Sequence, residues 1–149
     1  MAQNREQLSA SLEDYLEAIL HLSAEGRVAR GKDIADLLRV ARPSVTGALR
    51  ALAARRLIHY KPYGFVTLTK AGHRQALRVA DKHRILKSFF TEVLGVRTPE
   101  AQEAACRAEH ALGPSIVDRL MGLTEFLSGG GENRNWAGEF QAFYQARQA

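Results

Sequence analysis

The sequence of 149 residues has a single cysteine, Cys106, and lacks any long run of apolar residues. One cysteine cannot form an internal disulfide, which leaves it as a metal ligand or a small buried side chain in a reducing compartment. No run approaches the roughly 18 apolar residues of a membrane span, and residues 1–6 lack the apolar stretch of a signal peptide. These absences predict a cytoplasmic protein, and the hydrophobic content of 46% is sufficient for a globular core.

Acidic residues are scarce in the middle of the chain. Residues 27–87 hold fifteen Lys or Arg against three Asp, a net charge of +12, whereas the remaining residues have a net charge of −7. Basic side chains favour a polyanion because neutralised phosphates release their condensed counterions, and acidic flanks favour cations. The pattern indicates a nucleic-acid partner for the middle segment, with a solvated basic face as the alternative.

The N-terminal half has the order of elements of a winged helix. Apolar residues at helical spacing predict a helix of about fifteen residues that begins shortly after Leu8. A short helix over 31–38, a tight connection and a third helix opened by Pro43 then form a helix-turn-helix. Residues 57–60 and 65–69 are rich in β-forming residues and flank a Pro/Gly turn, so they predict a hairpin that serves as the wing.

Polar and basic side chains of this half are candidates for DNA contact. In the major groove Arg can pair with guanine, while Ser and Thr can reach base edges or phosphates. The hairpin tip would lie near the phosphate backbone or the minor groove, although any one of these residues taken singly is also compatible with an ordinary polar face. The predicted DNA-binding residues are Arg30, Lys32, Arg42, Pro43, Ser44, Thr46, Gly47, Arg50, Lys61 and Tyr63.

The C-terminal half is predicted to be helical and to dimerise. A connector helix over about 70–94 and a helix over about 99–112 precede a last clear helix, which begins after Gly113 and has a broad apolar stripe. Two or three short helices can scarcely enclose a hydrophobic core by themselves. We therefore expect the apolar stripe to be buried against a second copy of the chain in a twofold homodimer. The predicted interface residues are Ile116, Leu120, Leu123 and Leu127.

The predicted fold class is mainly α with a small β-hairpin wing. A winged helix-turn-helix DNA-binding domain is expected over residues 1–72, and a helical metal-binding and dimerisation domain over 73–128. Residues 129–149 are expected to form a Gly-rich linker and a short tail, in which aromatic residues recur at helical spacing.

The run from Cys106 to His110 combines a thiol, a carboxylate and an imidazole. In a helix over 99–112, Cys106 reaches Glu109 at i+3 and His110 at i+4, so all three would share one face. Asp14 and Glu17 likewise lie three residues apart in the first predicted helix. Taken alone, the run from Cys106 is equally compatible with a structural zinc site or a buried thiol.

Together these segments resemble the diphtheria-toxin-repressor and manganese-transport-regulator family of metal-dependent transcription repressors. The resemblance extends over about residues 8–127, and its matching segments are Leu12–Ile19, Ile34–Leu38, Pro43–Thr46, Leu68–Gly72, Lys82–Arg84 and Cys106–His110. It implies a homodimer on an inverted-repeat operator in double-stranded DNA, which is not an enzyme and represses metal-uptake genes when metal is plentiful. The metal ligands that it implies are Asp14, Glu17, His83, Cys106, Glu109 and His110. The chain is expected to be a short form without the family's C-terminal barrel domain.

Two departures from the family pattern bear on the choice of metal. The manganese-responsive branch typically has a carboxylate in place of Cys106, and the iron-responsive branch typically has a methionine in place of Asp14. Carboxylate oxygens suit Mn²⁺, whereas a thiolate raises the relative affinity for Fe²⁺, Co²⁺, Ni²⁺ and Zn²⁺. The sequence therefore predicts Fe²⁺ slightly ahead of Mn²⁺, with Zn²⁺, Co²⁺ or Ni²⁺ able to bind in vitro. Lys87 and Gln102 replace ligands of the iron branch's ancillary site, so that site is expected to be absent.

The number of ions per subunit stays open, and so does a second kind of function. A winged-helix regulator could respond to oxidation of Cys106 or to a small ligand, independently of metal. A metal hydrolase built on the same ligands is disfavoured because the sequence offers no evident nucleophile and such an enzyme has no use for the basic segment.

Overall fold

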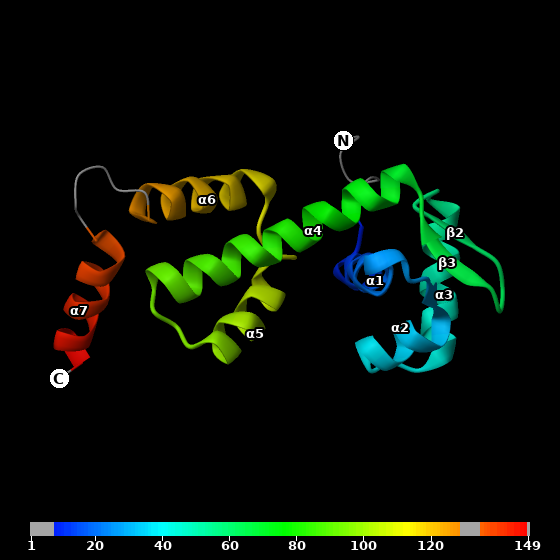
Figure 1. The fold of residues 1–149 in the computed structure, drawn as a ribbon, viewed down its shortest axis with the longest axis horizontal. Coiled ribbons are helices and arrows are strands. Elements are labelled where there is room, and N and C mark those ends of the chain that lie inside the picture. The colour runs from blue at the N-terminus through cyan, green and yellow to red at the C-terminus, as the bar shows by residue number, and fades with distance from the viewer. Residues whose placement is uncertain (1–7, 129–134, 149) are drawn as a thin grey trace. The chain divides into compact units, whose positions relative to one another are not determined.

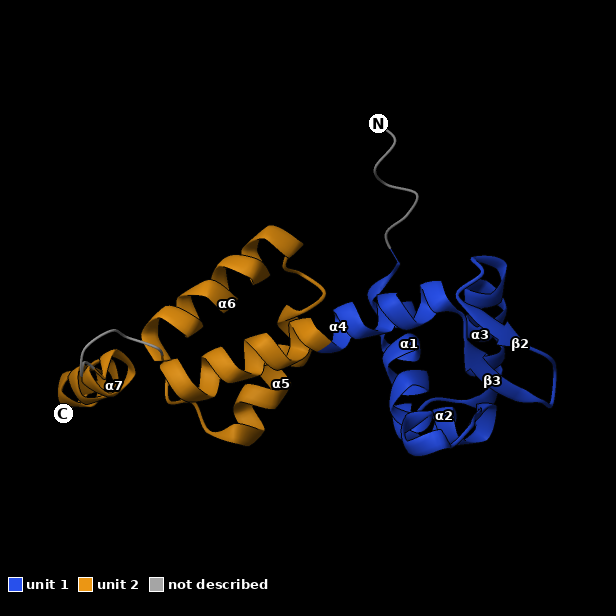
Figure 2. Ribbon diagram, turned by 45° about the horizontal axis from the view of Figure 1, so that its top comes forward, with its two compact units in different colours: residues 1–80 blue, residues 81–149 orange. Residues whose placement is uncertain are grey.

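The computed structural model describes residues 8–128 and 135–148, and the chain divides into two compact units, residues 1–80 and 81–149 (Figures 1 and 2). The fold is mainly helical with one small antiparallel sheet, as predicted. None of the described helices is long and apolar enough to cross a membrane. The first unit contains α1 (Ala10–Leu22), the 3₁₀ turn η1 (Ala24–Gly26), β1 (Ala29–Arg30), α2 (Gly31–Leu38), α3 (Arg42–Ala54), β2 (Ile58–Tyr60) and β3 (Phe65–Leu68). α4 (Lys70–Ser88) begins in the first unit and continues into the second, where the π-helical turn η2 (Phe89–Val93), α5 (Thr98–Ala108), α6 (Pro114–Ser128) and α7 (Trp136–Gln148) follow.

The core of the first unit forms where the apolar faces of α1, α2 and α3 meet. α1 begins after Ser9, whose side-chain oxygen accepts a hydrogen bond from the Leu12 N–H at 3.3 Å. Leu16, Ile34 and Leu52 are completely buried in this core. Burial of each such side chain contributes about 1.5–3 kcal/mol, so this cluster fixes the helix-turn-helix.

The sheet has the strand order β1-β3-β2, and both pairs are antiparallel. β2 and β3 form the predicted hairpin. β1 was not predicted from the sequence, because two residues cannot show an alternating pattern; Arg30 pairs with Phe65 on the otherwise open side of β3. Along β3 the exposure alternates, with Val66 buried between the exposed Phe65 and Thr67.

The start of α4 is fastened to the turn between α3 and β2. The Thr69 hydroxyl donates to the carbonyl oxygen of Arg56 at 2.8 Å and accepts the N–H of Gly72 at 3.0 Å. Gly72 lies so close to this turn that an added Cβ would be 1.8 Å from the carbonyl oxygen of Leu57. Only glycine therefore fits at this position of the segment Leu68–Gly72.

Two predicted helices of the second unit end earlier than expected. The connector predicted to reach Leu94 is α-helical only to Ser88, and the backbone then widens into the π-helical turn η2. In that turn the Thr91 hydroxyl bonds to the carbonyl oxygen of Lys87 at 3.0 Å, and the chain leaves it at Gly95 in a left-handed conformation. α5, predicted to reach residue 112, ends at Ala108. The predicted Gly-rich linker at 129–131 lies outside the described residues, while the tail beyond it contains α7.

Candidate metal centre and DNA-binding surface

Glu109 is a charged side chain buried in the second unit, with 1% of its surface exposed. Its Oε2 lies 2.7 Å from Nδ1 of His83, and its Oε1 lies 3.3 Å from Nε2 of His110. A buried carboxylate is costly unless cations or hydrogen-bond donors surround it. The two imidazoles therefore explain how Glu109 is accommodated inside the unit.

Two helices, α4 and α5, carry the donor atoms of this site. His83 lies in the second half of α4, Cys106 lies in the last turn of α5, and Glu109 is the C-cap residue of α5. His110 lies in the turn beyond the end of α5, next to Glu109, and stays a predicted ligand. Pro114 then occupies the first position of α6, where its missing N–H costs no hydrogen bond.

The donor atoms of His83, Cys106 and Glu109 all lie within 4.8 Å of one another. Ligands bound at about 2.0–2.3 Å from one ion are separated by distances of this order. In addition, Nε2 of His83 is buried without a hydrogen-bond partner among the residues that the structure describes. Imidazole, thiol and carboxylate in one cluster are a donor set for a divalent transition metal, so these residues fit the metal that the family implies.

The two carboxylates predicted as ligands in the first unit lie on α1. Asp14 and Glu17 are both half-buried and one turn apart. Tyr15 lies between them in sequence and points into the core, where burial raises the pKa of its phenol above the usual value of 10.0. Asp14 and Glu17 stay predicted ligands.

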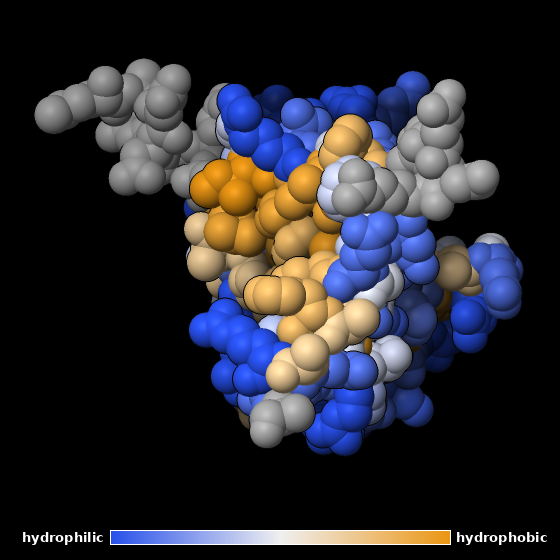
Figure 3. All heavy atoms as spheres, turned by 90° about the vertical axis from the view of Figure 1, so that its left-hand side faces the viewer, coloured by the Kyte–Doolittle hydropathy of each residue, from blue (hydrophilic) through white to orange (hydrophobic). Residues whose placement is uncertain are grey.

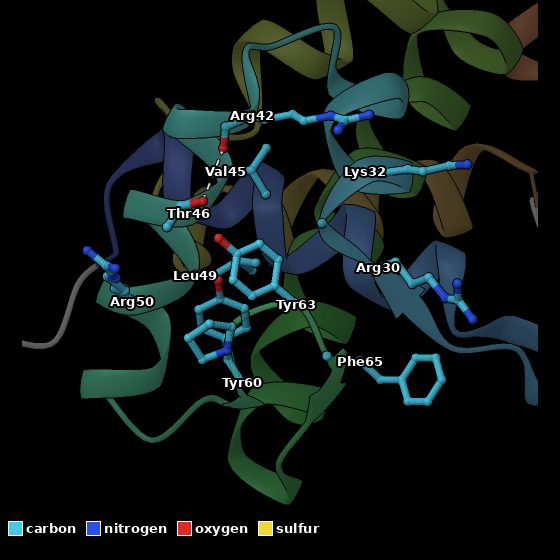
Figure 4. Close-up of a pocket in the computed structure, with 13 residues that line it drawn as sticks. Arg30, Lys32, Arg42, Val45, Thr46, Leu49, Arg50, Tyr60, Tyr63 and Phe65 are labelled. Atoms are coloured by element: carbon cyan, nitrogen blue, oxygen red, sulfur yellow. Dashed lines mark hydrogen bonds between the residues drawn. The ribbon is translucent and has the colours of Figure 1, made fainter.

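A concave surface of about 660 Å³ lies between α3 and the hairpin of the first unit (Figure 4). We call this surface the wing pocket. Six of the predicted DNA-binding residues line it, namely Arg30, Lys32, Arg42, Thr46, Arg50 and Tyr63. The other four predicted residues, Pro43, Ser44, Gly47 and Lys61, are exposed but do not line the pocket.

Two aromatic residues of the hairpin that were not predicted from the sequence also line the wing pocket. Tyr60 and Phe65 come from β2 and β3, and Phe65 contacts Arg30. The alternation of side chains along β3 could have predicted the position of Phe65, because a buried Val66 places Phe65 on the opposite face of the sheet.

The apolar stripe of α6 is only partly covered within the chain. Of the four predicted interface residues, Ile116 and Leu123 are exposed, and Leu120 and Leu127 are half-buried. Figure 3 shows apolar side chains gathered on one face, flanked by polar ones. A surface of this kind is typical of an interface between protein chains.

Comparisons with known proteins agree with both units. Residues 7–66 match the family described as the iron-dependent repressor N-terminal DNA-binding domain, and residues 69–129 match its metal-binding and dimerisation domain. An uncharacterised HTH-type transcriptional regulator of Methanocaldococcus jannaschii is 38% identical over 114 residues, which cover 76% of this chain and 91% of that protein. The HTH-type transcriptional regulator MntR of Listeria welshimeri is 32% identical over 117 residues, which cover 78% of this chain and 82% of that protein.

A solved structure described as a manganese-dependent transcriptional repressor with manganese superimposes with a TM-score of 0.71. It is 29% identical and the match covers 77% of this chain and 53% of that one, so the chain spans about half its length. A winged-helix DNA-binding unit followed by a helical metal-binding and dimerisation unit defines a metal-dependent transcriptional regulator. The chain belongs to the iron-dependent repressor family, which confirms the resemblance predicted from the sequence.

Proposed function

We propose that this repressor binds DNA as a homodimer, that a divalent metal ion promotes its binding to an inverted-repeat operator, and that it thereby represses metal-uptake genes. The observation that carries the proposal is the cluster of His83, Cys106 and Glu109, with a buried imidazole nitrogen that lacks a hydrogen-bond partner among the described residues. The same chain carries the basic wing pocket, which suits a polyanion.

The proposed ligands are Asp14, Glu17, His83, Cys106, Glu109 and His110. When bound, a divalent ion supplies positive charge that offsets the clustered carboxylates. His83 and His110 hold the carboxylate of Glu109 in place, which preorganises the part of the site in the second unit.

Asp14 and Glu17 belong to the DNA-binding unit, and their inclusion rests on the family resemblance of the segment Leu12–Ile19. Ligation by residues of both units would select one spacing of the two recognition helices, an allosteric coupling of typically about 1–3 kcal/mol. The test is a mobility shift of operator DNA with and without a chelator. Equal binding in both conditions would contradict the proposal.

For the metal, we propose Fe²⁺ slightly ahead of Mn²⁺. The thiol of Cys106 favours the softer ion, whereas the oxygen donors suit either. The measurement is the metal content after anaerobic purification, combined with operator binding titrated by Fe²⁺ and by Mn²⁺. Operator binding that Mn²⁺ supports at lower free concentration than Fe²⁺ would reverse this assignment.

A second candidate mechanism is regulation through oxidation of Cys106, because this thiol is exposed. Cys106→Ser would abolish the response in that case, whereas Asp14→Ala and His110→Ala would leave it intact. Metal-dependent repression predicts loss of the response in all three variants.

A further inference from the structure

Arg30 and Phe65 form a contact on the wing that the family assignment does not explain. They are cross-strand partners of β1 and β3, and the guanidinium carbon of Arg30 lies 5.0 Å from the centre of the Phe65 ring. Figure 4 shows both side chains together at one side of the wing pocket, with Arg50 at the other. Arg30 forms no ion pair with any residue that the structure describes, and its guanidinium lies over the Phe65 ring instead.

This arrangement leaves the hydrogen-bonding edge of Arg30 available. A guanidinium that lies over an aromatic ring uses its face for that contact. Its N–H groups point outward from the edge of the guanidinium, where they can reach two oxygens of one phosphate. The wing pocket has no acidic residue in its lining that would compete for these donors. Phe65 itself is 53% exposed, so an approaching partner would also cover apolar surface.

Tyr63 supplies a second, independent observation at the tip of the same hairpin. Its backbone φ is +61°, in the left-handed region that side chains other than Gly and Asn rarely adopt. Its side chain is completely exposed, so no packing within the described chain accounts for a tyrosine there. The turn that holds Tyr63 at this φ is closed by a hydrogen bond from the Gly64 N–H to the Lys61 carbonyl oxygen at 2.9 Å, so the ring is presented at the tip of the hairpin.

We propose that Phe65 is a positioning residue for DNA binding: its ring holds Arg30 of β1 against a backbone phosphate beside α3, while Tyr63 lays its ring against the neighbouring minor-groove sugars. This inference rests on the proposed function, since the duplex is the one held by α3. Phe65 acts through Arg30 and is a positioning residue, whereas Arg30 and Tyr63 touch the DNA.

The test is a double-mutant cycle with Arg30→Ala, Phe65→Ala and the combined variant. DNA binding is measured by fluorescence anisotropy over a series of KCl concentrations. Two kinds of DNA are used: duplexes that the unsubstituted protein selects from a random library in the presence of Mn²⁺, and one mixed-sequence duplex without metal. Arg30→Ala is expected to weaken binding about tenfold and to reduce the salt slope by about 0.9, the value for one phosphate contact. Phe65→Ala is expected to cause a smaller loss with a partly reduced slope, and the combined variant should bind like Arg30→Ala.

Conservative variants separate positioning from simple packing. Phe65→Tyr keeps a ring and should restore the salt slope, while Phe65→Leu keeps only apolar bulk and should not. Tyr63→Ala should weaken binding severalfold at an unchanged salt slope, and Tyr63→Phe should bind like the unsubstituted protein. His59→Ala is the matched control, because His59 is an exposed hairpin residue that does not line the wing pocket.

Three results would overturn the inference. The first is an unchanged salt slope in Arg30→Ala. The second is a loss of affinity in the combined variant that equals the product of the losses in Arg30→Ala and Phe65→Ala. The third is the same affinity and salt slope in Phe65→Tyr and Phe65→Leu. Metal dependence is measured on the unsubstituted protein alone, whereas the wing contact is measured from ratios between variants, so either can fail separately. If the unsubstituted protein binds neither kind of duplex, both proposals are refuted.

Discussion

Replacement of Glu109 by glutamine should remove most of the stabilisation that metal binding gives to the protein. The substitution preserves size and shape but removes the negative charge from a side chain that is 1% exposed and lies 2.7 Å from His83. Since the carboxylate is both a proposed ligand and the partner of another ligand, we expect a loss of metal affinity of at least about a hundredfold, the upper end of the effect of an outer-shell substitution.

The size of the effect follows from binding linkage. At a free metal concentration a hundred times the dissociation constant, binding stabilises the native state by about 2.7 kcal/mol. For a chain of this length, about 2–4 °C of Tm per kcal/mol gives an increase of roughly 5–11 °C. A hundredfold weaker site at the same metal concentration is half occupied, so the stabilisation falls to about 0.4 kcal/mol, or roughly 1 °C.

The assay is thermal unfolding followed by circular dichroism, with a chelator and with Mn²⁺ at the stated excess. Glu103→Gln is the matched control, since Glu103 lies on the same helix, is exposed and pairs with Arg107 on the surface. That variant should keep the full metal-induced increase in Tm. An unaltered increase in Glu109→Gln, or an equal loss in both variants, would refute the assignment of Glu109 to the metal site.

Four further substitutions test other parts of the structure. Gly72→Ala should lower the free energy of unfolding by about 3 kcal/mol, because its Cβ would meet the carbonyl oxygen of Leu57; Gly47→Ala in α3, with nothing within 4 Å, should instead raise it by about 0.5–1 kcal/mol. Urea unfolding measures both. Cys106→Asp should shift selection towards Mn²⁺ and lower the Zn²⁺-to-Mn²⁺ affinity ratio by more than about tenfold, measured by competition with a chelating dye. Gln141→Ala should cost about 1 kcal/mol, because its amide donates to two carbonyl oxygens of η2, at 3.1 and 3.5 Å; an unchanged urea midpoint would show that this contact does not stabilise the unit.

The order of helices and the wing could be predicted because each element buries one periodic face. The helix with Val45, Leu49 and Leu52 at helical spacing is α3, and all three side chains are buried. β1 could not be predicted, since its two residues become a strand only through pairing with β3. The π-helical turn η2 could not be predicted either, because it interrupts the helical pattern over only five residues.

The proposed metal site could be predicted only in part from local spacing in the sequence. Glu109 follows Cys106 by three residues, and the structure brings them together. His83 could be assigned only through the family resemblance, because no local pattern relates residues 26 positions apart, yet it forms the short contact to Glu109. The contact between Arg30 and Phe65 required the register of β1 against β3, which no single segment of sequence contains.

The proposed ligands differ in burial, and this difference separates metal selection from folding. Glu109 is buried and held by imidazoles, so any change there alters both the charge inside the unit and the donor set. Cys106 is exposed, and a different donor at its position changes the affinity for each metal with little effect on packing. The difference between a thiol here and the carboxylate typical of the manganese-responsive branch can therefore arise by one substitution without repacking the core. On this argument Cys106→Asp should retain the unfolding free energy of the metal-free protein within about 0.5 kcal/mol, the range of ordinary surface substitutions.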